Sequence, residues 1–187
     1  MREWEIVGRF DGSPRVEFPV RLELGNVVAI GYEFGYVVDE VRTTSQQVPY
    51  RLVFRRDDSE AARRRAAWTW RSYRATGVWW AGCWPPHLHD VPGTVHPVRA
   101  GEARLALHRL AYEGRTRLVV VLVVGGVLAL FLAWSTRQTG WPGALLAVLG
   151  VALLGGTLLT GRLVGWARAR HRALLARFER QRHAPRS

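Results

Sequence analysis

The sequence predicts an α+β membrane protein: a small N-terminal domain with an antiparallel sheet and a helix, a two-helix transmembrane hairpin, and a basic amphipathic C-terminal helix. Two apolar runs carry the membrane part of this prediction. Residues 118–136 are 19 consecutive residues without a formal charge, and residues 138–161 are 24 more. A helix needs roughly 20 apolar residues to cross a hydrocarbon core of ~30 Å. We therefore expect both runs to span a bilayer.

The 187 residues divide into three parts under this interpretation. Residues 1–115 are long enough for one small cytoplasmic domain with its own core. Residues 116–162 hold the hairpin, with its two spans at about 118–136 and about 141–161. Residues 163–187 form a basic juxtamembrane helix that ends in a short tail.

Alternating apolar and polar residues predict strands in the first 56 positions. The segments cover residues 3–10, 15–24, 27–41 and 49–56, and turn-forming residues separate them. Pro19 lacks the N–H that a central strand donates, so its segment is expected at a sheet edge or a bulge. Four strands in so short a stretch favour an antiparallel meander.

A helix is predicted over residues 60–74, because they are rich in Ala and Arg and follow the turn at 57–59. Gly77 is the expected C-cap. The alternating tryptophans of this segment leave a strand as the alternative. Residues 78–97 contain four prolines and predict a loop, and residues 101–113 predict a short amphipathic helix that leads into the first span.

The arginines predict the orientation of the hairpin, because positive residues flanking membrane spans stay on the cytoplasmic side. The connecting loop holds Arg137 alone. Arginines that flank the two runs on their other sides are Arg104, Arg109, Arg115 and Arg117 before the first, and Arg162, Arg168, Arg170, Arg172 and Arg177 after the second. We expect an inner-membrane protein of bacterial type with two spans and both termini in the cytoplasm. The N-terminus lacks the apolar core of a cleaved signal peptide.

The formal net charge of +12 raises nucleic acid as a class of partner. The charge is uneven along the chain, however. Residues 1–116 hold 17 arginines and 14 acidic residues, whereas residues 117–187 hold 10 arginines and one acidic residue. The excess flanks the apolar runs, where anionic lipid headgroups account for it. We therefore expect an anionic bilayer as the partner, and not nucleic acid.

Aromatic and basic side chains predict where the chain meets the membrane interface. Trp134 and Trp141 bracket the connecting loop, and Trp166 marks the cytoplasmic face, as the members of an aromatic belt do. The basic helix that follows the second run is amphipathic, which is typical of a helix on a lipid surface. Its arginines expected to contact headgroups are Arg168, Arg170 and Arg172.

A second group of tryptophans lies in the predicted loop that follows Gly77. Trp79 and Trp80 precede the Pro85-Pro86 pair, which prevents the segment from continuing as regular structure. Exposed aromatic side chains there are expected to contact lipid headgroups. The alternative is that they fill the core of the N-terminal domain.

Cys83, His87, His89 and His96 form the metal-like pattern of the chain. Thiolate and imidazole are ligands that zinc prefers, so zinc is the cofactor to consider. The spacing matches no standard zinc pair, and the alternative is a polar loop with incidental histidines. The sequence predicts no other cofactor, and patterns such as a Gly-rich phosphate loop are absent from it.

Small residues in the two apolar runs predict close packing of helices, because they let helix backbones approach each other. The stripes contain Gly125, Ala129 and Ala133 in the first run, and Ala152 and Gly156 in the second. They are expected to pair the hairpin with itself or with another membrane protein. The arginines at 63–65 spread around the circumference of the predicted helix and favour a solvated surface over a phosphate site.

These observations favour a non-enzymatic, membrane-anchored interaction or regulatory module. Two alternatives stay open. One is a metal-binding or enzymatic cytoplasmic domain that uses the loop from Cys83 to His96. The other is an oligomeric channel or a transporter-associated subunit, although the spans carry none of the ionisable residues that mark ion pathways.

Overall fold

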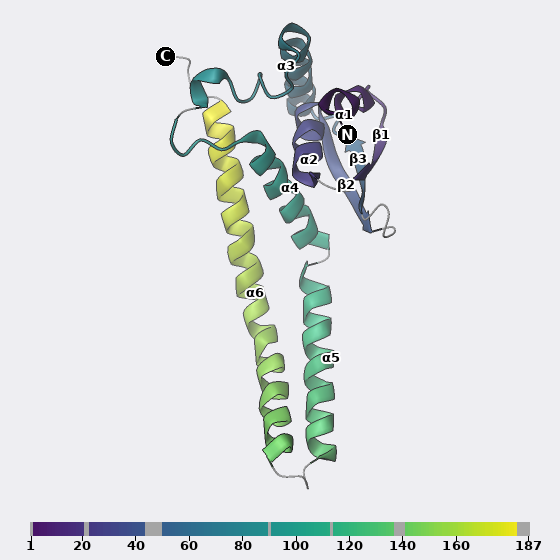
Figure 1. Ribbon diagram of the computed structural model, residues 1–187, viewed down its shortest axis with the longest axis vertical. Helices are drawn as coiled ribbons and strands as arrows, with labels where there is room; N and C mark the ends of the chain where they lie inside the picture. Colours follow the sequence, from purple (N-terminus) through teal and green to yellow (C-terminus); the bar gives the residue numbers. More distant parts are fainter. Residues whose placement is uncertain are drawn as a thin grey trace. The chain divides into compact units, whose positions relative to one another are not determined.

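The computed structural model describes residues 2–20, 23–43, 50–89, 91–112, 114–136 and 141–182 (Figure 1). The chain forms two compact units. Unit 1 comprises Met1–His108 and His171–Ser187, and unit 2 comprises Arg109–Arg170. The C-terminal segment therefore folds with the N-terminal residues, and the unit boundaries differ from the positions 115 and 162 that the sequence suggested.

An antiparallel sheet forms one part of unit 1, with three strands within the described ranges. The strands, in the spatial order β1-β3-β2, are β1 (Arg15–Val20), β3 (Tyr50–Arg56) and β2 (Tyr36–Thr43). Phe54 of the central strand pairs with Val16 on one side and with Val38 on the other. Pro19 lies on the edge strand β1, where its missing N–H leaves no ladder bond unmade.

The α+β class of the N-terminal domain is thus confirmed, with three strands and seven helices counted over the described residues. The four-stranded meander is wrong, because two of the segments expected as strands contain helices. These helices are α1 (Glu3–Arg9) and α2 (Leu24–Glu33). Both are short, and periodicity does not separate a buried helix from a strand over such lengths.

One glycine on α2 and one on α4 (Pro97–Tyr112) permit two close contacts of α2. A Cβ at Gly31 would lie 2.8 Å from Cε1 of Phe54, so the bare backbone lets α2 rest on the sheet. On another side, a Cβ at Gly101 of α4 would lie 2.7 Å from the backbone N of Ala29. The helix is therefore held between the sheet and α4, and this burial outweighs the β propensity of its valines.

Helix α3 (Glu60–Thr76) confirms the helical prediction for residues 60–74 and removes the strand alternative. Ser59 caps its N-terminus by accepting a hydrogen bond from the N–H of Ala62 at 3.3 Å. Gly77 ends it with a φ of 72°, the left-handed conformation that favours glycine. Local signals at both ends explain why this helix was predictable.

In the segment expected as a loop at 78–97, the described residues before Pro97 form turns, bends and one short 3₁₀ helix, η1 (Pro86–Leu88). Helix α4 begins at Pro97, four residues earlier than the predicted helix at 101–113. Proline is favourable at the start of a helix because its missing N–H would have no partner there.

The core of unit 1 lies between the sheet and α1 and α2. Its aromatic centre is Phe10, which stacks edge-on against Phe54 at a centroid separation of 5.2 Å. Trp79 is among the largest fully buried side chains, with 1% of its surface exposed. Trp80 is half-buried against the same core. The core role that the sequence offered as the alternative is therefore the one that Trp79 has.

Unit 2 contains α5 (Gly114–Ser135) and the first part of α6 (Trp141–Arg182). The backbones of the two helices lie close together at a pair of glycines. A Cβ at Gly126 would lie 3.1 Å from the carbonyl O of Gly150, and a Cβ at Gly150 would lie 3.0 Å from that of Gly126. Glycine at both positions permits this backbone approach.

Within the described residues, no helix taken singly is both long and apolar enough to cross a bilayer. The apolar part of α5, Val119–Ser135, falls short in length. The segments Trp141–Thr157 and Leu159–Arg182 of α6 meet the length and composition criteria together, with a bend of 43° between them.

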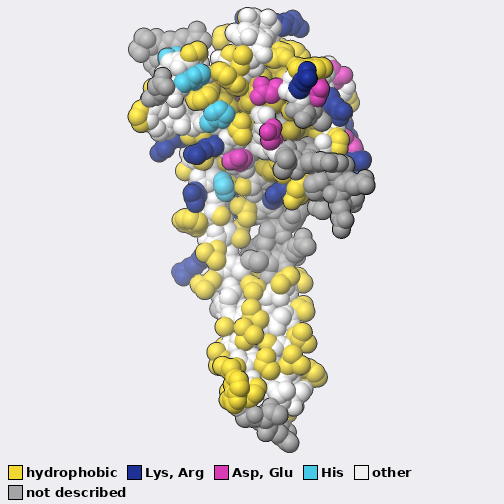
Figure 2. Space-filling model, viewed as in Figure 1, with side chains coloured by type: hydrophobic (Ala, Val, Ile, Leu, Met, Phe, Trp, Pro, Cys, Tyr) yellow, Lys and Arg dark blue, Asp and Glu magenta, His cyan; other side chains and the backbone are white. Residues whose placement is uncertain are grey.

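Large apolar side chains are exposed along both helices of unit 2, and Figure 2 shows them over much of the narrow lower end of the view. On α5 they include Val121, Val124, Leu128, Phe131 and Trp134. On α6 they include Trp141, Leu145, Val148, Val151, Leu159, Leu163 and Trp166. Contiguous apolar surface of this kind is unusual on a monomer in water.

Replacing Trp79 with alanine is predicted to destabilise unit 1 by about 3–5 kcal/mol, because it removes a fully buried side chain and leaves a cavity. The matched control is Trp4→Ala, since Trp4 lies on α1 and is 60% exposed. Its loss should change stability by less than about 0.5 kcal/mol. Urea unfolding of the purified protein, followed by circular dichroism, measures both. Equal stability of the two variants would contradict the core role of Trp79.

Candidate functional site

Six charged and aromatic side chains from four helices converge in unit 1, and we call them the charge cluster. Helix α2 supplies two, α3 and α4 supply one each, and the C-terminal end of α6 supplies two. The members are Tyr32, Glu33, Arg65, Arg104, Glu179 and Arg182. Charged groups are rarely buried unless they are paired, so their grouping calls for a structural or functional reason.

Glu33 is the most buried member, with 1% of its surface exposed. Its Oε2 accepts a hydrogen bond from Nη2 of Arg182, whose side chain is 12% exposed. Its Oε1 is buried and has no hydrogen-bond partner among the described residues. The carboxylate therefore depends on Arg182 for its compensation, because an unpaired buried charge costs several kcal/mol.

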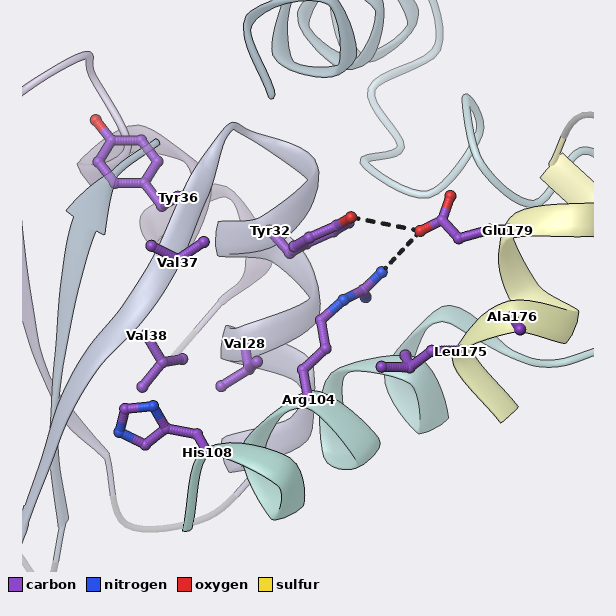
Figure 3. A pocket seen from close by; sticks show the side chains of 10 residues that line it. All are labelled: Val28, Tyr32, Tyr36, Val37, Val38, Arg104, His108, Leu175, Ala176 and Glu179. Carbon is purple, nitrogen blue, oxygen red and sulfur yellow. Dashed lines mark hydrogen bonds and ion pairs between the residues drawn. The ribbon is translucent and has the colours of Figure 1, made fainter. Parts of the chain in front are cut away.

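Glu179 connects three elements, as Figure 3 shows. Its Oε1 accepts hydrogen bonds from the Tyr32 hydroxyl at 3.4 Å and from Nη2 of Arg104 at 3.2 Å. Its Oε2 lies 3.6 Å from Nη1 of Arg182. Two arginines thus balance this carboxylate, and the end of α6 is tied to both α2 and α4.

The Tyr32 ring lies between two guanidinium groups. Cζ of Arg104 lies 3.4 Å from the ring centroid and Cζ of Arg65 lies 3.7 Å from it. Two groups so close to one centroid have to occupy opposite faces of the ring, since they would overlap on a shared face. Nε of Arg65 also donates to the carbonyl O of Tyr32 at 2.8 Å. The stack lets two cations approach each other in a partly buried region, because the ring attracts both.

Apolar contacts and amide hydrogen bonds fasten the same end of α6 to unit 1. Phe178 is fully buried beside Cys83, Val95 and Ala100. The Gln181 side chain accepts from the N–H of Val95 and donates to its carbonyl O, both at 2.8 Å. The segment of α6 from residue 171 onward is therefore an integral part of the domain.

Burial sets the protonation behaviour of two groups here. It raises the pKa of Glu33 above its ordinary value, although Arg182, Arg104 and Arg65 oppose the shift. Burial and the nearby Glu33 raise the pKa of the Cys83 thiol well above its ordinary value. The thiol is therefore protonated at neutral pH and is a poor nucleophile.

Two cavities flank the charge cluster. The first, of about 420 Å³, has apolar walls that include Val28, Val38 and Leu175, and the Arg104–Glu179 pair lies at one end of it (Figure 3). The second, of about 660 Å³, we call the arginine cavity. Its lining residues are Tyr32, Ala61, Arg64, Arg65, Trp68, Gly82, Glu179 and Arg182.

The predicted metal ligands lie in different surroundings. Cys83 is buried beside Phe178, whereas His87 is exposed. His89 and His96 pack against the Trp84 ring at centroid separations of 4.1 Å and 4.5 Å. Over the residues that the structure describes, no group of three or more Cys, His, Asp or Glu side chains is placed to hold a metal ion.

The predicted membrane-interface residues on α5 and α6 include exposed tryptophans and arginines with different contacts. Trp134, Trp141 and Trp166 are exposed. Nη2 of Arg168 donates to the carbonyl O of Leu110 at 2.7 Å, and Cζ of Arg170 lies 5.7 Å from the Trp166 centroid. Arg172 is exposed on the part of α6 that belongs to unit 1.

The residues of the predicted packing stripe lie in different surroundings. Ala129 and Ala133 are buried in unit 2, whereas Ala152 is exposed. A Cβ at Gly125 or Gly156 would make ordinary contacts, at 3.6 Å with Leu153 and at 4.0 Å with Leu122. A Cβ would be tighter at Gly126, the neighbour of Gly125, and at Gly150, since each would lie about 3 Å from the carbonyl O of the other glycine.

Sequence reasoning did not identify any member of the charge cluster as a site residue. Two signals pointed to it. Glu33 is the one charged residue between Leu24 and Val38, and Glu179 is the one acidic residue after position 116. A lone carboxylate in an apolar or basic segment requires a partner elsewhere in the chain.

Comparison with the models of protein families, with curated proteins and with solved structures finds no match to this chain.

Replacing Arg182 with glutamine is predicted to destabilise unit 1 by about 3–5 kcal/mol, because Glu33 loses the charge that compensates its burial. Arg180→Gln is the control, since Arg180 is exposed on the same helix. It should change stability by less than about 0.5 kcal/mol. Urea unfolding measures the stability of both variants. Restoration of stability in the Glu33→Gln, Arg182→Gln double variant would confirm that the loss comes from the uncompensated charge.

The raised pKa of Glu33 also predicts a pH dependence of stability. A carboxyl group with a raised pKa in the folded state stabilises the fold fully below its unfolded pKa, and this contribution is lost as the pH rises through the folded value. The unfolding free energy of the wild type relative to Glu33→Gln should therefore fall as the pH rises above the ordinary glutamate pKa of about 4.3. A rising difference for Glu33→Gln would contradict the assignment.

Proposed function

We propose that the protein is a two-span membrane protein of the bacterial inner membrane, in which unit 2 is the anchor and unit 1 is a non-enzymatic interaction or regulatory domain. The observation that carries the proposal is the exposed apolar surface of unit 2, which includes Phe131, Trp141 and Val148. Such a surface is unfavourable in water and favourable in hydrocarbon, at roughly 25 cal/mol per Å².

The packing inside unit 2 supports the same proposal. Gly126 and Gly150 lie at the contact between α5 and α6, where Leu154 and Leu130 of the opposite helix pack against them. Other large apolar side chains, such as Val124 and Val148, are exposed. Helices in lipid tolerate this exposure and associate through close packing at small residues.

The arginine distribution supports an orientation with both termini cytoplasmic, because Arg104 and Arg109 precede α5, and Arg162 and Arg168 follow the apolar part of α6. Arg137 is the one arginine in the connecting segment, which lies outside the described residues. An anionic bilayer is the partner that we propose for these flanking charges.

A regulatory or interaction role for unit 1 follows from how the chain enters and leaves the hairpin. The entering helix α4 and the departing end of α6 are joined inside unit 1 by the Arg104–Glu179 ion pair at 3.2 Å. A partner that changes the packing of unit 1 would therefore act on both ends of the anchor. The non-enzymatic assignment rests on the protonated, buried Cys83 and on carboxylates that are engaged in ion pairs.

The topology is tested by labelling with a membrane-impermeant maleimide in intact cells. Cys83 is first replaced by alanine, and one cysteine is then introduced at Thr139 or at Arg71, which is exposed on α3. Cys83 does not serve as its own internal marker, because its burial prevents labelling on either side of a membrane. We expect Thr139→Cys to be labelled in intact cells and Arg71→Cys only after permeabilisation. Labelling of Arg71→Cys in intact cells would contradict the orientation, and release of the protein by alkaline carbonate would contradict the anchor.

A further inference from the structure

The arginine cavity has a composition that the anchor proposal does not explain. One face of α3 supplies Ala61, Arg64, Arg65 and Trp68, which are spaced i, i+3, i+4 and i+7 and therefore lie on the same side of a helix. Two of the three consecutive arginines thus share a cavity, contrary to the solvated surface that the run at 63–65 favoured. Arg182 and Glu179 complete the charged lining.

The lining charges favour an anion. Glu179 is balanced within the charge cluster by Arg104 and Arg182, so it leaves the positive charge of the α3 arginines uncancelled. Nη2 of Arg65 is buried and has no hydrogen-bond partner among the described residues. Arg64 pairs with Glu60 at 3.3 Å, but both side chains are more than 70% exposed, and such a pair is readily exchanged for another anion.

Trp68 adds a flat apolar wall to these charges. The indole is 44% exposed, and its Nε1 donates to the carbonyl O of Gly82 at 3.2 Å. A Cβ at Gly82 would lie 3.1 Å from the same Nε1, so glycine is the residue that permits this position of the ring. A fixed, exposed tryptophan face beside arginines provides stacking and phosphate recognition together.

We infer that the arginine cavity binds a small molecule that carries a phosphate group next to a planar ring, as a mononucleotide does. Guanidinium groups bind phosphate through paired hydrogen bonds, and the Trp68 face takes the ring. The volume of about 660 Å³ lies within the range of about 300–1,000 Å³ typical of small-molecule sites. The inference rests on residues of unit 1 alone and does not depend on the membrane proposal.

The test measures binding to the full-length protein in detergent micelles by isothermal titration at physiological salt. The probes are AMP, GMP and UMP, with adenosine, ribose 5-phosphate and inorganic phosphate as fragments. We expect at least one mononucleotide to bind at least about tenfold more tightly than each fragment, because the site recognises both parts. Failure of all three mononucleotides at millimolar concentration, or equal binding of ribose 5-phosphate, would overturn the inference.

Three variants locate the binding site. Arg64→Gln and Trp68→Leu alter exposed groups of the cavity and should each weaken the best mononucleotide about tenfold. Arg63→Gln is the matched control, since Arg63 belongs to the same run, is exposed and does not line the cavity. It should leave affinity within about twofold. Equal weakening by Arg63→Gln and Arg64→Gln, or no weakening by either cavity variant, would contradict a site in this cavity.

Discussion

The buried ion pair between Glu33 and Arg182 is the constraint on which the arrangement of unit 1 depends. It joins residues that lie 149 positions apart in the chain. Taking a carboxylate out of water costs several kcal/mol unless a counter-charge accompanies it, so α2 keeps its buried position only while the end of α6 is docked. The C-terminal segment is therefore a structural element of the first unit, although an apolar hairpin separates the two in sequence.

The remaining contacts of the charge cluster follow from this docking. With α6 in place, Glu179 meets Arg104 and the Tyr32 hydroxyl, and Arg104 in turn covers one face of the Tyr32 ring. Arg65 covers the opposite face and thereby positions α3 against α2. Each cation is balanced by a carboxylate or by a ring face, which is how a partly buried region holds three arginines. The arginine cavity exists where this network ends at the surface of α3.

The two units differ in whether their large apolar side chains are buried or exposed. Unit 1 buries its large side chains, such as Phe10, Phe54 and Trp79, between the sheet and the helices. Unit 2 places glycines at its helix contact and leaves large side chains such as Phe131 exposed. Water favours the first arrangement and hydrocarbon favours the second, since lipid tails are as apolar as the side chains themselves. This contrast supports a role in which unit 2 anchors and unit 1 binds.

Local signals in the sequence determined several elements correctly. Ser59 and Gly77 delimit α3, the alternating residues around Phe54 predict β3, and the long apolar runs predict the helices of unit 2. The helical state of α1 and α2 was not predictable, because a short apolar segment fits a buried helix and a strand equally well until its neighbours are known. The same reason applies to Trp79, whose burial depends on how the turns after α3 fold back.

The charge cluster and the cavity beside it were decided by tertiary structure alone. Electrostatic pairing between Glu33 and Arg182 has no local periodicity, and a lone carboxylate in an apolar segment indicates that a partner exists without indicating which arginine it is. The chain offers 27 arginines and no lysine, so composition does not distinguish the partner from the other basic residues. The docking of α6 places Arg182 within hydrogen-bond distance of Glu33. Because the pair is buried, the attraction between the two charges is strong, whereas solvent would screen it at the surface.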